Sequence, residues 1–280
     1  MAERPIGVGV IGCDHRHIYG MLQGMLDVGA VGKAWWTEGE PQTLAGWSKR
    51  FPTLPRVADY RQILDDPTVD LVLIAAVPCD RTRLAVEAMA AGKDVMVDKP
   101  GCTSLDDLAQ IRAATASTGR IWSVNFSEHF EVPAVTRALE LVRTGAIGCV
   151  VQTVGLGPHR LNPGTRPPWF YQPEKTGGIL CDIGSHQIDQ FMVFTGSTTV
   201  DIVSASSGNF ANPDHPAFED LARCCCAETV AKAMCGSTGT HPTRCPPGAT
   251  AACLYSAPKA PSSCASTWTW PAAPAPTTCC

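Results

Sequence analysis

The stretch IGVGVIG at residues 6–12 is a short apolar run that ends in a glycine. Its length and its flanks are those of a buried parallel strand. Apolar residues then recur at the spacing of one helical face, at Ile18, Met21, Leu22, Met25 and Leu26. The pattern therefore predicts a strand, a tight turn and a helix.

The same alternation continues through the first half of the chain. Apolar runs predict further strands at residues 31–37, 70–77, 94–97 and 120–126. Helical patterns lie between them at residues 80–91 and 104–117. Strands that alternate with helices form a doubly wound parallel sheet, so we predict an α/β fold whose first domain spans residues 1–126.

A second domain is predicted to begin at residue 127. The patterns indicate a helix at residues 133–144, a long strand at 147–157, a helix at 185–195 and a strand at 200–206. Residues 158–175 are rich in proline, arginine and aromatic residues and are expected to form a loop. Because so few strands are present, we expect residues 127–221 to be the start of an incomplete α/β domain with an open sheet.

Charge and hydropathy exclude several classes of partner. The chain carries 22 basic and 26 acidic residues, a net charge of -4, and no basic patch, so nucleic acid is not an expected partner. No apolar run approaches membrane-spanning length, and the N-terminus lacks the apolar region of a signal peptide. We therefore expect a cytoplasmic protein that does not bind a membrane.

Residues 222–280 differ in composition from the rest of the chain. They contain no Ile, Phe, Asp or Asn, yet they hold eight prolines and nine of the fourteen cysteines. Such a composition cannot bury a core. A zinc or disulfide module is the rival explanation, but no CxxC occurs and His241 has no second histidine at finger spacing. We predict that the segment is an out-of-frame tail, disordered or non-native.

The genetic code provides a test of this frameshift hypothesis. When the same DNA is read one base earlier, every Cys-Cys junction encodes leucine, and Met234-Cys235 encodes valine. With permitted codons, residues 222–241 become EVLLRGDGREGYVRVDWYT. That string alternates apolar residues around a Gly-Asp-Gly turn and so predicts a β-hairpin.

Two motifs carry candidate chemistry. Lys99 follows an apolar strand within the triplet DKP (residues 98–100), and Asp182 and His186 lie four apart within GGILCDIGSHQID (residues 177–189). A spacing of four places two side chains on one helical face. Removal of a proton from an alcohol requires a cation beside the oxygen, a base for the proton and a carboxylate that orients the base. We predict that Lys99, Asp182 and His186 are these catalytic residues.

The two motifs together resemble those of the Gfo/Idh/MocA family of NAD(P)-dependent oxidoreductases, and the resemblance runs from about Ile6 to Asp220. It implies an N-terminal Rossmann domain and NAD or NADP as cofactor. The implied reaction is hydride transfer between the cofactor and a CH–OH group of a sugar, inositol or similar polyol. The intact family fold is expected to form a homo-oligomer. In this chain the altered tail is expected to disturb the oligomer and to impair activity.

The resemblance also assigns roles to residues. Lys99 would bridge the nicotinamide ribose and the substrate hydroxyl, and His186 would be the general base. Asp182 would bind the substrate hydroxyl and help to orient the base. His129 and Trp169 are further candidates for the substrate site. Asp189 is expected to fix the helix or to form its hydrogen bonds locally.

The cofactor loop departs from the family pattern. The expected cofactor-binding residues are Gly12, Cys13, Asp14, His15, Arg16, Glu38, Pro78, Lys99 and Pro100. Asp14 and His17 occupy the later glycine positions of the loop, so a negative charge is expected beside the pyrophosphate. His15, Arg16 or His17 would have to compensate it. Glu38 is the candidate for the ribose hydroxyls.

Two alternatives stay open at this point. Asp14, His15 and His17 would form a metal site, although a polar turn without metal is the reading we adopt. The alternative function is a catalytically silent nucleotide-binding protein of the same fold, which the Asp14 position favours.

Overall fold

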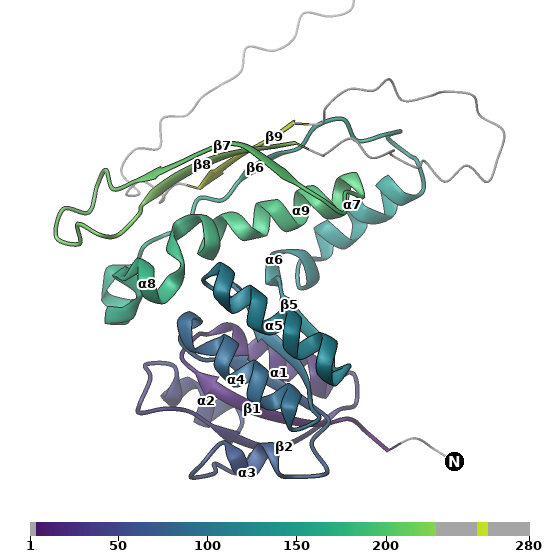
Figure 1. The fold of residues 1–280 in the computed structure, drawn as a ribbon, viewed down its shortest axis with the longest axis vertical. Helices are drawn as coiled ribbons and strands as arrows, with labels where there is room; N and C mark the ends of the chain where they lie inside the picture. Colours follow the sequence, from purple (N-terminus) through teal and green to yellow (C-terminus); the bar gives the residue numbers. More distant parts are fainter. Residues whose placement is uncertain (1–3, 228–250, 257–280) are drawn as a thin grey trace, which may run out of the picture.

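A computed structural model of the chain describes residues 4–227 and 251–256, the last six as backbone only. Figure 1 shows two sheets that stand apart from each other. Helices α7 (Pro133–Arg143) and α9 (Ser185–Thr195) lie under the second sheet, on the side that faces the first domain. Helices α7 and α9 therefore lie between the second sheet and the first domain.

The first sheet has five parallel strands in the order β2-β1-β3-β4-β5. Their bounds are β1 Gly7–Cys13, β2 Val31–Trp36, β3 Leu71–Ala75, β4 Asp94–Asp98 and β5 Trp122–Asn125. This sheet confirms the predicted doubly wound α/β class. The strand order reverses between β1 and β3, and ligands of such sheets bind beside that point, at the carboxyl ends of the strands.

Helices cover both faces of the first sheet. They are α1 His17–Asp27, α2 Leu44–Arg50, α3 Arg61–Leu64, α4 Arg81–Ala90 and α5 Leu105–Thr118. Helices α1, α4 and α5 confirm the sequence prediction. Helices α2 and α3 were not predicted, because seven and four residues are too few for a helical period to appear in a sequence window.

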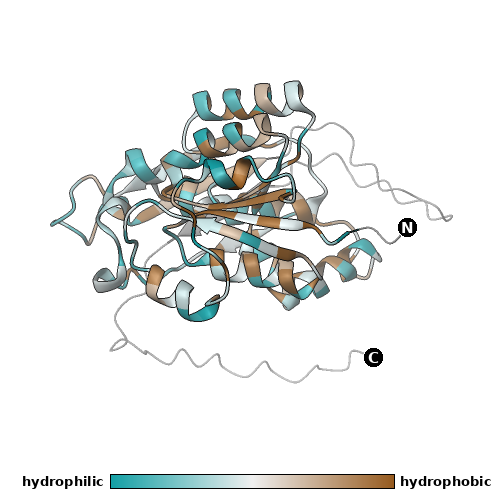
Figure 2. Cartoon of the chain, turned by 90° about the horizontal axis from the view of Figure 1, so that it is seen from below, coloured by the Kyte–Doolittle hydropathy of each residue, from teal (hydrophilic) through white to brown (hydrophobic). Residues whose placement is uncertain are grey.

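Apolar side chains fill both faces of this sheet. All seven residues of β1 are buried, as expected for a central strand with helices on each side. On one face Trp47 packs with Ile18 and Leu22, and on the other Leu84 and Met89 pack on the strands. Figure 2 shows the strands as the most hydrophobic part of the domain, between helices with mixed surfaces.

The second sheet has the order β6-β9-β8-β7. Its strands are β6 Val154–Leu156, β7 Asp201–Gly208, β8 Leu221–Ala227 and β9 Ala251–Ser256. Strand β8 pairs antiparallel with β7 and β9, whereas β6 and β9 are parallel. Two short helices complete the described elements: α6 (Ser127–Phe130) follows β5, and α8 (Pro173–Thr176) lies between β6 and α9.

The long strand predicted at residues 147–157 is wrong. Only the three residues of β6 are in a strand. Gly145 and Gly148 precede it with φ angles of 74° and 72°, and this left-handed backbone turns the chain where the prediction continued the strand. The first strand was predicted to end at Gly12, but β1 continues to Cys13 through an irregularity in its pairing with β3.

Strand β8 includes the first six residues of the predicted out-of-frame tail. Ala222, Cys224 and Cys226 are buried on one side of it. The reread string also has a strand pattern at this position, so a strand is compatible with both frames. Residues 228–250 and 257–280 lie outside the described part of the chain, and the frameshift hypothesis stays a prediction.

Helix α5 has a defined cap at each end. The Ser104 hydroxyl accepts a hydrogen bond of 3.0 Å from the Asp107 backbone N–H, and Gly119 ends the helix with a φ of 67°. These contacts satisfy backbone groups that have no partner within the helix.

We expect Ser104→Ala to lower the free energy of unfolding by about 1 kcal/mol, because it removes the acceptor of the first-turn N–H. Chemical denaturation would measure the change. Ser48→Ala is the matched control, since Ser48 is exposed within α2, and it should change the free energy by less than about 0.5 kcal/mol. Equal effects of the two substitutions would contradict the role of the cap.

Candidate functional site

A cavity of about 620 Å³ lies between the two domains, at the carboxyl ends of the strands of the first sheet. Among the residues that line it are Asp14, His15, Arg16, His17, Glu38, Thr43, Lys99, Glu128, His159, Arg166, Trp169, Asp182 and His186. The two sequence motifs therefore both contribute to the wall of one cavity.

Lys99 and Asp182 join the two domains across this cavity. Lys99 directly follows β4 and is 4 % exposed. Its Nζ donates hydrogen bonds to Asp182 Oδ1 at 2.8 Å and to the Asp182 carbonyl oxygen at 3.0 Å. Burial alone would raise the pKa of Asp182, but the ammonium of Lys99 holds that pKa below its usual value.

His186 lies one turn beyond Asp182. Residues Leu180–Gly184 form a π-helical segment, a feature frequent at functional sites, and α9 begins at Ser185. Burial, reinforced by the nearby charge of Lys99, lowers the pKa of His186 to about 4. The imidazole is therefore neutral at physiological pH and able to accept a proton.

The predicted orientation of His186 by Asp182 has no hydrogen bond to support it among the described residues. The Asp182 carboxylate is bonded to Lys99, and His186 Nδ1 is buried without a described hydrogen-bond partner. Asp182 thus positions the cation of the site.

Asp98, the last residue of β4, is fully buried and has three cationic or imidazole neighbours. His15 Nδ1 lies 2.7 Å from Oδ2, and His17 Nδ1 lies 2.8 Å from Oδ1. Arg81 Nη2 lies 3.3 Å from Oδ2. Burial would raise the pKa of Asp98, but His15 and Arg81 hold it well below its usual value.

Arg81 is a structural residue that the sequence analysis missed. It is 1 % exposed and donates hydrogen bonds to main-chain oxygens of Ala76, Asp98, Lys99 and Pro100. Arg81 thereby fixes the chain on both sides of Lys99. An arginine at the start of a helix is usually exposed, and nothing in its spacing indicated burial.

The structure changes which residues would make up the alternative metal site. His15 and His17 meet Asp98 rather than Asp14, and one ligand atom from each of the three lies within 4.8 Å of the others. Both oxygens of Asp98 already face imidazole nitrogens, and the guanidinium of Arg81 opposes a further cation at this carboxylate. The cluster is better described as a hydrogen-bonded ionic group.

The turn after β1 suits a dinucleotide with one exception. Gly12 has a φ of 81°, and a Cβ there would lie 2.5 Å from the Ala76 nitrogen, so glycine is required. Arg16 precedes α1, whose N-terminus makes no side-chain cap hydrogen bond and can face an anion. Asp14 is the exception, because burial raises its pKa to about 6 and leaves it mostly ionised at neutral pH.

Four of the predicted cofactor residues do not line the cavity. Gly12, Cys13, Pro78 and Pro100 support the turn and the strand ends behind its wall. Cys13 is fully buried, and burial raises the pKa of its thiol. Asp14, His15, Arg16, Glu38 and Lys99 do line the cavity.

Of the predicted substrate residues, too, some line the cavity and some do not. Trp169 lines the cavity, but His129 does not. His129 Nδ1 lies 3.0 Å from Asp189 Oδ2 and so ties α6 to α9. Asp189 therefore does not bond to a neighbour in the sequence, because its partner is 60 positions away, while its other predicted role, to fix helix α9, stays a prediction.

Glu128 is a cavity residue that the sequence analysis missed. Its Oε1 lies 3.4 Å from His159 Nε2, and His159 Nδ1 lies 3.0 Å from the Gly157 carbonyl oxygen. Both partners of the imidazole are acceptors, so they favour the protonated ring. The contact with Glu128 raises the pKa of His159 and lowers that of Glu128. The feature of the sequence that could have identified Glu128 is its position three residues after β5.

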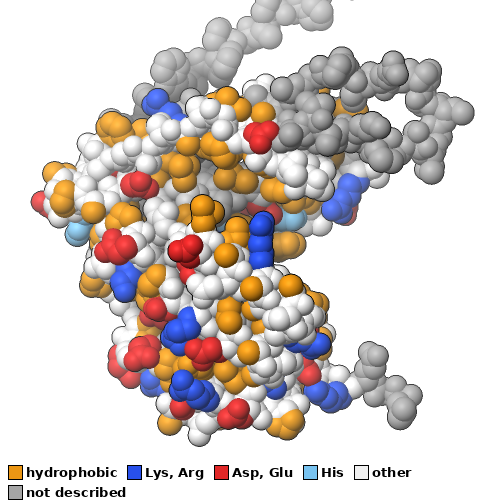
Figure 3. Space-filling model, viewed as in Figure 1, with side chains coloured by type: hydrophobic (Ala, Val, Ile, Leu, Met, Phe, Trp, Pro, Cys, Tyr) orange, Lys and Arg blue, Asp and Glu red, His pale blue; other side chains and the backbone are white. Residues whose placement is uncertain are grey.

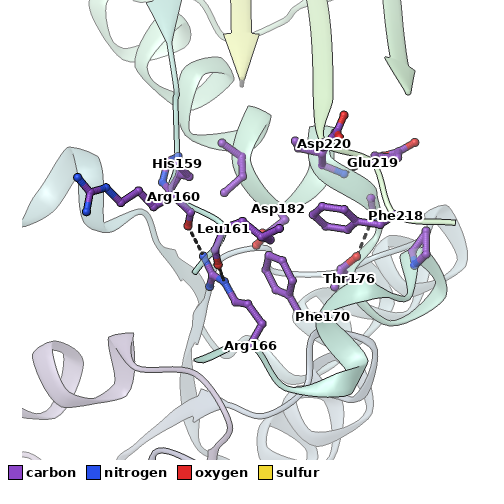
Figure 4. A pocket seen from close by; sticks show the side chains of 14 residues that line it. His159, Arg160, Leu161, Arg166, Phe170, Thr176, Asp182, Phe218, Glu219 and Asp220 are labelled. Carbon is purple, nitrogen blue, oxygen red and sulfur yellow. Dashed lines mark hydrogen bonds between the residues drawn. The ribbon is translucent and has the colours of Figure 1, made fainter. Parts of the chain in front are cut away.

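Arg166 lines both the main cavity and a smaller one of about 50 Å³. Figure 4 shows its guanidinium bonded back to its own loop, through Nε to the Leu161 carbonyl oxygen at 2.8 Å and Nη2 to the Arg160 carbonyl oxygen at 3.2 Å. It also lies over the Phe170 ring, 4.3 Å from the centroid. These contacts hold the second-domain loop beside Asp182.

Family models match both parts of the chain. Residues 6–126 match the oxidoreductase family with an NAD-binding Rossmann fold, and residues 135–238 match the GFO/IDH/MocA C-terminal domain. A solved structure from Erwinia carotovora atroseptica SCRI1043, assigned as an oxidoreductase, is 36% identical with a TM-score of 0.83. That match covers 94% of this chain and 73% of the other.

Curated relatives are more distant. Levoglucosan dehydrogenase from Pseudarthrobacter phenanthrenivorans is 28% identical over 57% of this chain and 41% of its own length. The NAD-dependent scyllo-inositol 2-dehydrogenase of Bacillus subtilis is 28% identical over 47% of this chain and 36% of its own. The chain thus spans less than half the length of these relatives.

Two surface properties complete the description. On the face drawn in Figure 3, acidic and basic side chains are interspersed over the first domain. Within the described residues, no helix combines the length and the apolar character needed to cross a membrane.

We expect Arg81→Met to lower the free energy of unfolding by about 3–5 kcal/mol, because it leaves the buried Asp98 carboxylate without its guanidinium. Arg83→Met is the control: its side chain is 57% exposed and pairs with Glu87 one turn away, so it should cost less than about 0.5 kcal/mol. Urea unfolding of both variants measures the difference. Similar small losses would show that Arg81 does not hold the site together.

Proposed function

Because the chain belongs to the Gfo/Idh/MocA family of NAD(P)-binding oxidoreductases, we propose that it transfers a hydride between a polyol CH–OH group and NAD or NADP. The observation that carries this proposal is the meeting of Lys99, Asp182 and the neutral His186 at one cavity. The nicotinamide, when bound, supplies the hydride acceptor. The protein supplies position, charge and the proton acceptor.

His186 is the proposed general base. Its neutral imidazole takes the hydroxyl proton while the carbon loses its hydride. Burial keeps the imidazole uncharged in the resting protein, and the ammonium of Lys99 disfavours its premature protonation.

Lys99 is proposed to stabilise the oxygen as it loses its proton. Its ammonium is held by Asp182 on one side of the cavity, so it needs little reorganisation when negative charge develops on the substrate oxygen. Asp182 shares the cavity wall and is available to accept a hydrogen bond from a substrate hydroxyl.

The named relatives support a polyol or sugar as the substrate class. They include levoglucosan, D-xylose and scyllo-inositol dehydrogenases. Both an NAD- and an NADP-dependent scyllo-inositol dehydrogenase are among them, so we keep both cofactors in the proposal. Glu38 in the cavity wall is the proposed partner of the ribose hydroxyls.

A catalytically silent nucleotide-binding protein is the second candidate. Asp14 favours it, because this largely ionised carboxyl lines the cavity at a position where the family loop has glycine. Saturable NADH binding without turnover across a polyol panel would select this alternative.

We also propose that the frame is shifted from about residue 222, and that the intact protein forms a homo-oligomer through its second sheet. Exposed apolar side chains on β7, such as Ile202 and Val203, support such an interface. Resequencing of the gene around codon 222 tests the frame. An uninterrupted frame, matched by the mass of the purified protein, would contradict the shift.

We expect Lys99→Ala to lower kcat by about 10²–10³-fold, as removal of a preorganised donor does elsewhere. Reduced-nicotinamide absorbance in a polyol assay measures it. Lys49→Ala, an exposed lysine on α2, is the matched control and should leave kcat unchanged. An unchanged rate in Lys99→Ala, with the variant folded, would count against the assignment.

We expect the acidic limb of kcat/KM for alcohol oxidation to lie near pH 4, at saturating cofactor, instead of near the ordinary histidine value. The direction of this pH dependence follows from the role of His186 as the base. Above that pH the imidazole is neutral and active, and below it the proton is already bound. A pH–rate profile in the oxidation direction tests this. A limb at about pH 6.5 that disappears in His186→Asn would show that the imidazole is not desolvated as proposed.

A further inference from the structure

Of the charged side chains with which the second domain lines the main cavity, Arg166 alone has no partner of opposite charge among the described residues. Glu128 pairs with His159 at 3.4 Å, and Asp182 pairs with Lys99 at 2.8 Å. Arg166 lines the same wall, but its described contacts are two carbonyl oxygens and one aromatic ring. The wall therefore presents one cation whose charge no described carboxylate balances within ion-pair distance.

The guanidinium of Arg166 is held in place while part of it stays available. Its Nε donates to the Leu161 carbonyl oxygen, its Nη2 donates to the Arg160 carbonyl oxygen, and the ring of Phe170 lies against it (Figure 4). Because a guanidinium has five N–H donors, both donors of Nη1 and one of Nη2 have no partner among the described residues. One donor from each of these nitrogens makes the planar fork that binds a carboxylate through two parallel hydrogen bonds.

Burial makes this unbalanced charge costly. The side chain of Arg166 is half-buried, and burial lowers its pKa, although the nearby carboxylate of Asp182 partly opposes the shift. A cation that has lost water without gaining an anion is less stable than a paired one. An anionic group on a bound ligand would supply the missing partner.

The anion is expected in the main cavity. The smaller cavity is also lined by Glu219 and Asp220, whose carboxylates disfavour a further negative charge there. In the main cavity Arg166 shares the wall with Asp182, which acts on its charge and is bonded to Lys99. A ligand with its hydroxyl at the candidate catalytic residues therefore has the free fork of Arg166 nearby.

We propose that Arg166 is a specificity-determining residue that binds the carboxylate of an acidic polyol, such as a sugar acid, while the CH–OH group to be oxidised lies at Lys99 and His186. The inference rests on the proposed function and narrows its substrate class from polyols in general to those that carry a carboxylate. One fork with one positive charge matches a carboxylate monoanion. It would leave part of the charge of a phosphate ester unpaired.

The test is isothermal titration calorimetry of matched sugars against the 280-residue chain saturated with NADH. D-Glucuronate is paired with D-glucose and D-galacturonate with D-galactose, so that each pair differs only in a carboxylate that replaces a CH2OH group. We expect the acid of at least one pair to bind about tenfold more tightly than its neutral partner, because charge-assisted bidentate hydrogen bonds are the strong ones. Equal or weaker binding of the acid in both pairs would overturn the inference.

Three variants locate the preference, and circular dichroism checks that each is folded. Arg166→Met should weaken binding of the acid about tenfold and leave that of the neutral sugar unchanged, because only the fork and its charge are lost. Arg166→Lys should restore part of the preference, since an ammonium keeps the charge but lacks the fork. Arg143→Met, an exposed arginine on α7 outside both cavities, should behave as the parent. A preference for the acid that survives in folded Arg166→Met would contradict the assignment.

Further outcomes separate this inference from the proposed function. Tighter binding of D-glucose 6-phosphate than of D-glucuronate would assign Arg166 to a phosphate instead and overturn the carboxylate. Loss of NADH affinity in Arg166→Met, without any change in the preference between sugars, would place the guanidinium on the cofactor. Neutral sugars that bind as well as the acids would sink the inference and leave the proposed function intact. If the folded chain binds neither NADH nor any of these sugars, both fail.

Discussion

The buried carboxylate of Asp98 is the point on which the site depends. A carboxylate without solvent is stable only when it is paired and hydrogen-bonded, and Asp98 recruits Arg81 from α4, His15 from the turn before α1 and His17 from the first position of α1. These partners come from two separate segments of the first domain. Their convergence fixes the end of β4, and Lys99 is the next residue along the chain.

Two ionic groups hold Lys99, one through its backbone and the other through its side chain. Asp98 and Arg81 hold the backbone of Lys99 from within the first domain, and the side chain of Lys99 contacts Asp182 in the second. The π-helical segment places Asp182 in the wall of the cavity immediately before α9, which carries His186. Asp182 and His186 thus lie on helical elements and Lys99 directly follows a strand, which favours precise positioning.

Much of this arrangement could be predicted from residue patterns. The apolar runs of β1, β3 and β4 predicted the parallel sheet, and the candidate residues taken from the two motifs, Lys99, Asp182 and His186, line one cavity. The partners of Asp98 could not be predicted, because a contact between residues 15 and 98 produces no periodic pattern in the sequence around either residue. The length of strand β6 was overestimated because apolar residues continue in the sequence beyond the residues whose backbone pairs with another strand.

The Lys99–Asp182 contact has a consequence for ligand affinity. A substrate hydroxyl that enters between these groups replaces an ion pair that is already satisfied, so the exchange of hydrogen bonds yields little net binding energy. The ion pair instead favours the reacting form of the substrate over its neutral form, because the ammonium attracts the substrate oxygen most strongly when that oxygen becomes anionic. Such a site is expected to hold its neutral substrate loosely and its reacting form tightly.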